Sequence, residues 1–166
     1  MDNPDFRDML SALNEAGAEF ILVGAHALAA HGYVRATGDL DIWVRADEAN
    51  AERVAAAFEA FGGASISMFD VTVDDLSVPG IGVAIGVEPN RIDLHTQIPG
   101  LTFDEARSDA LEASLCGQPV RVLSHGALVR AKRAAMAKRP PESPKRAQDA
   151  ADLAWLESLA PKKRKK

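Results

Sequence analysis

The sequence has a single cysteine, no long apolar run and no recognisable export signal, and these absences narrow the class of protein. With only Cys116 among its 166 residues, the chain can form no internal disulfide bond, which is typical of proteins from reducing compartments. No apolar run approaches the ~20 residues that cross a bilayer. The first residues are acidic and lack the basic and apolar segments of a signal peptide. We therefore predict a cytoplasmic protein that does not contact a membrane.

Lysine is absent from residues 1–120, which contain six arginines and twenty acidic residues. Residues 121–166 instead contain thirteen lysines and arginines and only four acidic residues. A basic segment of this kind can bind a polyanion such as RNA. The alternative is that its end, residues 161–166, is a disordered solubilising tail. The chain length predicts one domain, or one domain with a small appendage.

The periodicity of the apolar residues predicts an α/β (α+β) fold with a mixed sheet flanked by helices. The expected helices span residues 4–16, 25–31, 46–61, 124–138 and 144–159, and the expected strands span 20–23, 40–45, 81–87, 91–98 and 120–123. Residues 64–79 fit neither pattern. Prolines between the last two helices predict a helical hairpin. The apolar side of the last helix is expected to consist of Ala147, Ala151, Leu153 and Leu156. The predicted organisation is a core at 1–123, a helical hairpin packed on it at 124–160 and a tail at 161–166.

Two of the predicted strands carry aspartates. Asp39 and Asp41 alternate with apolar residues, so they share one face of a strand. Adjacent carboxylates repel each other, and a hard cation such as Mg²⁺ relieves the repulsion. Asp93 lies in the alternating strand 91–95, where His95 shares its face. If the two strands are neighbours, three carboxylates converge and can hold two metal ions, as in nucleotidyl transfer. The alternative for the first pair is the exposed start of a strand.

A phosphate-binding turn is predicted close to these aspartates. Gly24 and Ala25 follow the buried strand 20–23 and begin a helix. Glycine lets the backbone approach a ligand closely, and the first amides of a helix attract anions. Arg35 lies just before the acidic strand, where it either contacts a phosphate or neutralises the carboxylates. This order of elements places an amide cradle beside the predicted metal site.

These motifs resemble those of a known superfamily. Residues 20–44, FILVGAHALAAHGYVRATGDLDIWV, resemble the signature of the nucleotidyltransferase superfamily that includes DNA polymerase beta. More narrowly, they resemble the bacterial AbiEii-like group. The matching positions are Gly24, His31, Gly32, Arg35, Thr37, Asp39 and Asp41, and RIDLH at 91–95 resembles the strand of the third carboxylate. Residues 120–139 and 145–157 resemble the group's C-terminal helices. Ala25 departs from the pattern, because it replaces a glycine or serine.

The resemblance implies an enzyme that moves a nucleoside monophosphate from a nucleoside triphosphate to an acceptor. It implies that Asp39, Asp41 and Asp93 are catalytic and hold Mg²⁺ or Mn²⁺. It further implies that the nucleotide is bound by five residues, namely Gly24, Ala25, Arg35, Thr37 and Lys132. The acceptor would be tRNA or a protein, and the role that of a toxin with a cognate antitoxin. Two alternatives stay open: a non-catalytic binding module of the same fold, and an antibiotic-type adenylyltransferase with a small-molecule acceptor.

Overall fold

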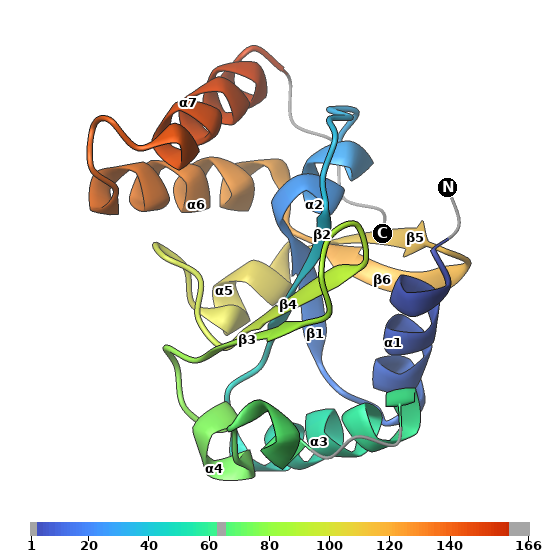
Figure 1. The fold of residues 1–166 in the computed structure, drawn as a ribbon. Coiled ribbons are helices and arrows are strands. Elements are labelled where there is room, and N and C mark those ends of the chain that lie inside the picture. Colours follow the sequence, from blue (N-terminus) through green and yellow to red (C-terminus); the bar gives the residue numbers. More distant parts are fainter. Residues whose placement is uncertain (1–2, 63–65, 160–166) are drawn as a thin grey trace.

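A six-stranded mixed sheet in the order β3-β4-β2-β1-β6-β5 forms the centre of the protein (Figure 1). The computed structural model describes residues 3–62 and 66–159. The strands are β1 (Phe20–Val23), β2 (Asp39–Val44), β3 (Gly82–Ile85), β4 (Arg91–His95), β5 (Leu111–Leu115) and β6 (Gln118–Val122). The helices of the described residues are α1 (Pro4–Glu15), α2 (Gly24–Ala30), α3 (Glu48–Gly62), α4 (Val73–Leu76), α5 (Phe103–Ser108), α6 (His125–Lys138) and α7 (Pro144–Glu157), with a 3-10 turn η1 (Ile66–Phe69). This arrangement confirms the predicted fold class.

The pairing of the central strands brings the aspartates together. Strand β2 runs parallel to β4 and antiparallel to β1, and the register sets Asp41 directly opposite Asp93. Strand β1 also pairs in parallel with β6. The two edge strands, β3 and β5, are antiparallel to their neighbours. The sheet is therefore mixed, and the acidic residues lie on its parallel pair β2 and β4.

Side chains alternate between the two faces of β2 and separate the core from the acidic face. Leu40 and Ile42 are fully buried on one face, in a cluster that includes residues of α1 and α3. The other face carries Asp39, Asp41 and Trp43. The Trp43 ring meets Phe103 of α5 edge-on, with 5.2 Å between the ring centroids. Helix α5 therefore covers the end of the acidic face that carries Trp43.

Helices α6 and α7 pack against each other at one end of the molecule (Figure 1). Ser124 caps α6 as its sequence predicts, by accepting a hydrogen bond from the amide of Ala127. The predicted apolar side of α7 is correct for Leu156, which is fully buried, and wrong for Ala147 and Ala151, which are exposed. The buried residues of α7 are Asp149, Asp152 and Leu156. Ion pairs, rather than apolar contacts alone, determine which side of this helix faces the protein.

The segment between β4 and α6 contains α5 and β5, which the periodicity did not predict, and β6, which contains most of the predicted strand 120–123. Helix α5 is followed by a hairpin of β5 and β6, whose two-residue turn is Cys116-Gly117. Both turn residues have positive φ, at 52° and 76°, as a tight hairpin that matches the strand twist requires. Within the unassigned stretch 64–79, η1 and α4 form short helical turns. The predicted tail at 161–166 lies outside the described residues. No helix of the described residues has the length and apolarity needed to cross a membrane.

Candidate active site

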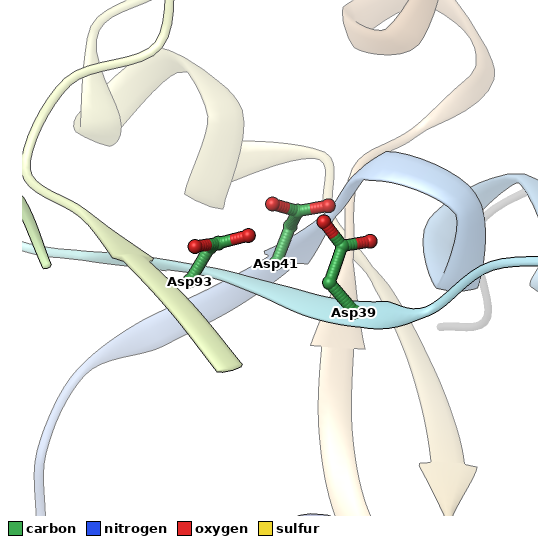
Figure 2. A group of neighbouring side chains, drawn as sticks. All are labelled: Asp39, Asp41 and Asp93. Carbon is green, nitrogen blue, oxygen red and sulfur yellow. The ribbon is translucent and has the colours of Figure 1, made fainter. Parts of the chain in front are cut away.

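The three predicted aspartates form one cluster on β2 and β4 (Figure 2). Each offers one carboxylate oxygen, and these oxygens all lie within 4.8 Å of one another. Figure 2 shows the three side chains on the same side of the two strands. The cause is the strand register, which aligns Asp41 with Asp93, together with the two-residue spacing that puts Asp39 on the same face. A hard cation with oxygen ligands fits such a donor set.

Each carboxylate of this cluster is oriented by a neighbouring side chain. The Thr37 hydroxyl donates to Asp39 Oδ1 over 2.8 Å. His95 Nε2 lies 3.1 Å from Asp41 Oδ1. Arg91 Nε donates to Asp93 Oδ1 over 2.9 Å. Thr37, predicted as a nucleotide contact, is thus placed where it holds a carboxylate. His95 contacts Asp41 on the neighbouring strand.

The environment of Asp93 favours its protonated form. Burial raises the pKa of the Asp93 carboxyl above its ordinary value, because the charged form loses hydration. The Arg91 guanidinium opposes this shift, whereas Asp39 and Asp41 add to it. The raised pKa therefore records both burial and the mutual repulsion of the cluster. A divalent cation would relieve that repulsion. The three carboxylates of the cluster therefore fit a metal ion.

Gly24 brings the start of α2 against the cluster. Its φ is +67°, and a Cβ atom at this position would lie 2.4 Å from Asp41 Oδ2. Only glycine therefore allows both the backbone conformation and the close approach to the carboxylate. Val23, which precedes the helix, makes no side-chain capping hydrogen bond. Gly24 and Ala25 line the cleft above the cluster.

His26, the third residue of α2, is partly buried. Burial lowers the pKa of its imidazole, and Asp41 and Asp39 only partly oppose the shift. Its Nε2 atom is buried and has no hydrogen-bond partner among the described residues. The ring instead meets Phe6 of α1 edge-on at 5.7 Å. His26 is therefore a neutral packing residue that joins α2 to the core beneath the site.

A cleft of about 900 Å³ opens over the carboxylates and extends to α6 and α7. This volume lies within the range of small-molecule and cofactor sites, about 300–1,000 Å³. The cleft is lined by the acidic cluster, the start of α2, the segment 35–38, strands β3 and β4, residues 97–99, and the facing sides of α6 and α7. A second cleft, of about 560 Å³, lies between the N-terminal part of β1 and the β5–β6 hairpin. It contains none of the predicted site residues.

The cations of the cleft wall are held by two buried carboxylates of α7. Lys132 Nζ lies 3.0 Å from Asp149 Oδ1 and 2.9 Å from Asp152 Oδ2. Arg35 binds the same Asp152 with two nitrogens, each over 3.2 Å. Arg139 Nε donates to Asp149 Oδ2 over 2.8 Å. Arg35 thus pairs with α7 and not with the acidic cluster.

This ionic network contains three cations and two anions, which leaves one positive charge at the wall of the cleft. Asp152 is fully buried and Asp149 nearly so. Buried carboxylates are stable only when they are paired, as these are. The sequence contains a signal for the pair, since Asp149 and Asp152 are three residues apart on a helix among apolar residues. That signal alone does not name the partners.

Comparisons with known proteins support the fold. No known protein family and no curated protein matches the sequence. Among solved structures, the Thermotoga maritima protein TM1012, provisionally assigned as a nucleotidyltransferase, aligns over 96% of this chain and 97% of its own, with 16% identity and a TM-score of 0.53. An antigenic nucleotidyltransferase-like protein from Paracoccidioides brasiliensis aligns over 94% of this chain and 76% of its own, with 17% identity and a TM-score of 0.52.

An antibiotic-resistance protein is also similar. The structure of ANT(2″)-Ia in complex with adenylyl-2″-tobramycin aligns over 92% of this chain and 95% of its own, with 17% identity and a TM-score of 0.50. Similarity at these identities defines the architecture and leaves the chemistry to the site. The chain has the nucleotidyltransferase fold, with its acidic cluster on two adjacent central strands.

Proposed function

We propose that this protein is a divalent-metal-dependent nucleotidyltransferase, which moves a nucleoside monophosphate from a nucleoside triphosphate to an acceptor hydroxyl. The observation that carries the proposal is the cluster of Asp39, Asp41 and Asp93 at the floor of the cleft. Three converging carboxylates repel one another in the absence of a ligand, and the charge of Asp41 adds to burial in raising the pKa of Asp93. A fold retains such a cluster more readily when its function requires the charge.

The residues divide into those that hold metal and those that hold phosphate. Asp39, Asp41 and Asp93 would bind Mg²⁺ or Mn²⁺, which supplies charge neutralisation of the phosphates and of the leaving group. The backbone at Gly24 and Ala25 faces the cleft, where its amides can donate to phosphate oxygens. Ala25 can do this through its amide although it has no hydroxyl. Lys132 lies across the cleft at the opposite wall.

Lys132 and Arg35 are the proposed partners of the distal phosphates. Both already contact Asp152, and Lys132 also contacts Asp149. Asp152 fixes their position, because it is fully buried and binds Arg35 through both of its oxygens. The network carries one excess positive charge, which a triphosphate at the open side of the cleft would neutralise.

The proposed transfer is a single substitution reaction at the α-phosphorus. The acceptor oxygen forms a bond to the α-phosphorus, the bond from that phosphorus to the bridging oxygen breaks, and pyrophosphate leaves. Asp93 accepts the proton of the acceptor hydroxyl. Asp93 has the position for this role, because it lies on β4 directly opposite Asp41 and lines the cleft.

Within this function, we propose membership of the AbiEii-like group and a role as the toxin of a toxin–antitoxin pair, with tRNA or a protein as the acceptor. The support is the sequence pattern from Gly24 to Asp41 and the basic residues of the C-terminal part of the chain. A small-molecule acceptor is the second candidate, since ANT(2″)-Ia shares the fold and was solved with an adenylylated antibiotic.

Labelled nucleotides test the proposal directly. Each of the four triphosphates, labelled at the α-phosphate, is incubated with the protein and Mg²⁺ in the presence of total tRNA, of a mixture of proteins, or of tobramycin. Label in one acceptor class supports the transfer and identifies the class. The control is the double substitution Asp39→Asn and Asp41→Asn, which should abolish labelling. Tight Mg²⁺-dependent nucleotide binding without any transfer would identify a non-catalytic module.

A further inference from the structure

The edge strand β3 lies directly beside the proposed proton acceptor. In the antiparallel register of β3 and β4, Ala84 pairs with Asp93, which in turn pairs with Asp41. Paired residues point to the same face, so these three form a row across the sheet. Ala84 and Gly82 are exposed and line the cleft. Because one has only a methyl group and the other no side chain, β3 leaves the side of Asp93 open.

The outer backbone of β3 is unpaired. The sheet order ends at β3, and among the residues described no backbone hydrogen bond joins it to a further strand. The Thr96 amide donates to the Ile81 carbonyl over 2.9 Å, which makes these residues a hydrogen-bonded pair. In an antiparallel ladder such pairs alternate, so the N–H and C=O groups of Gly82 and Ala84 point outward. They form a free strand edge beside the reacting centre.

This edge lacks the charged residues and prolines that commonly prevent strand addition. Residues 82–85 are Gly-Val-Ala-Ile, with no charge and no proline, whereas β5 at the opposite edge contains Glu112. Natural proteins commonly protect free edges with charged residues or proline. The edge at β3 is therefore suited to accept an extended backbone.

The charges of the cleft indicate which acceptor approaches along β3. Four of the five lysine and arginine residues that line the cleft, Arg35, Lys132, Arg139 and Lys145, belong to the segment before β2 or to the α6–α7 wall and its connection. On the β3 side, the only lysine or arginine among the described lining residues is Arg91, which is paired with Asp93. A polynucleotide would find almost no partner for its phosphates there. A polypeptide needs none, because its backbone can pair with the strand edge.

We propose that the acceptor is a hydroxyl side chain on an extended polypeptide that adds to β3 as a further strand. This inference rests on the proposed nucleotidyl transfer and assigns its acceptor. The residue of the peptide opposite Ala84 points into the cleft toward Asp93. Its oxygen forms the bond to the α-phosphorus, pyrophosphate leaves, and the proton passes to Asp93. Strands lie about 4.8 Å apart, so the side chain crosses about 10 Å from the added strand to β4. Tyrosine therefore reaches further than serine.

The test uses the outward N–H of Gly82. Proline at this position removes that donor without removing a hydrogen bond to β4, and proline is tolerated at the first residue of a strand. Gly82→Ala is the matched control, because it keeps the N–H and its Cβ would meet only the Leu94 carbonyl oxygen, at 4.0 Å. The acceptor is a nine-residue peptide of alternating threonine and lysine with a central tyrosine. A second peptide carries N-methyl groups along one edge, so that it cannot pair with β3.

Transfer of label from the α-phosphate to the peptide is measured at fixed Mg²⁺, with total tRNA as a parallel acceptor. We expect at least tenfold less labelling by Gly82→Pro than by Gly82→Ala, and at least tenfold less labelling of the N-methylated peptide by the unmodified protein. Equal labelling by the two variants, equal labelling of the two peptides, or labelling of tRNA alone would overturn the inference. Thermal stabilisation by triphosphate with Mg²⁺ separates the two proposals. If it persists, only the acceptor assignment fails, and if it is absent together with all labelling, the proposed function fails as well.

Discussion

Replacing Asp41 by asparagine should have opposite effects on ligand binding and on the stability of the ligand-free protein. The substitution keeps the shape of the side chain and removes one charge from the cluster. An amide is a poor ligand for a hard cation, so stabilisation by triphosphate with Mg²⁺ should be lost. In a chelator, the free energy of unfolding should stay the same or rise, because the repulsion within the cluster falls.

The size of this effect follows from the geometry of the cluster. Two unit charges at a separation of 4.8 Å repel by about 1 kcal/mol in water and by about 3.5 kcal/mol at an effective dielectric constant of 20. The cleft above the cluster is open to solvent, and Arg91 pairs with Asp93, and both reduce the repulsion toward the lower value. Asparagine also retains an oxygen that can accept from His95. We therefore expect a gain of at most about 1 kcal/mol, or about 2–4 °C in melting temperature for a chain of this size.

Thermal melts in chelator, and with triphosphate plus Mg²⁺, measure both effects. The unmodified protein should gain about 2.7 kcal/mol at a ligand concentration one hundred times the dissociation constant, and Asp41→Asn should gain almost nothing. Asp8→Asn is the matched control, since Asp8 is an exposed aspartate of α1 that pairs with Arg7 and lies outside the cluster. If Asp41→Asn lowers stability in chelator by about 1–3 kcal/mol, Asp41 satisfies buried donors and the metal assignment is wrong.

Three further predictions concern the residues around the cluster. Gly24→Ala and Gly17→Ala both place a side chain at positive φ, which destabilises the fold by about 1–2 kcal/mol. Only the new methyl group of Gly24→Ala meets a carboxylate. Urea denaturation should therefore show a larger loss of stability for Gly24→Ala, and equal losses would contradict the close approach. The pKa of Asp93 is raised in the folded state, so ionisation of Asp93 destabilises the fold as the pH rises through that pKa. Thermal melts in chelator from pH 3 to pH 7 should therefore show Asp93→Asn becoming progressively more stable relative to the unmodified protein. A difference in stability that does not change with pH would refute the shift. Asp152→Asn leaves Arg35 without a charged partner and leaves Lys132 with Asp149 alone, and it should cost about 3 kcal/mol in urea denaturation. Arg133→Ala, which breaks an exposed ion pair, should change little. Similar effects would mean that the buried network does not stabilise the protein.

The arrangement of the acidic strands was predictable because the period of a strand is two. The alternation of Asp39 and Asp41 with apolar residues fixes their shared face without any knowledge of the neighbours. Asp93 joins this pair only because β2 and β4 pair in parallel. These two strands are separated in the sequence by elements that include α3 and β3. Alternation alone leaves that pairing open, and the resemblance to the nucleotidyltransferase signature supplied it.

The orientation of α7 was not predictable from its apolar residues. Alanine contributes little to the choice of a buried face, because burying a methyl group stabilises only weakly. The decisive residues are Asp149 and Asp152. Aspartates are predicted to be exposed to solvent unless their partners are known. Those partners, Arg35 and Arg139, lie 117 and 10 residues away from the carboxylates they bind. No local pattern connects positions at such different separations.

The hairpin of β5 and β6 was missed for a related reason. Its turn, Cys116-Gly117, does not contain the Asn-Gly or Asp-Gly pair that marks such turns. Cys116 adopts a positive φ of 52° without the side chain that usually favours it. The pairing of β5 with β6 therefore determines the conformation of the turn, and the turn residues alone do not reveal the hairpin.

The central claim is that metal and triphosphate bind together at the acidic cluster, and isothermal titration calorimetry tests it most directly. A triphosphate with a non-hydrolysable bond between its α- and β-phosphates is titrated into the unmodified protein, once with Mg²⁺ and once with chelator. We predict saturable binding with one site per chain in Mg²⁺, and a loss of at least one hundredfold in affinity in chelator. Equal affinity under the two conditions, or no binding at millimolar triphosphate with Mg²⁺, would contradict the account.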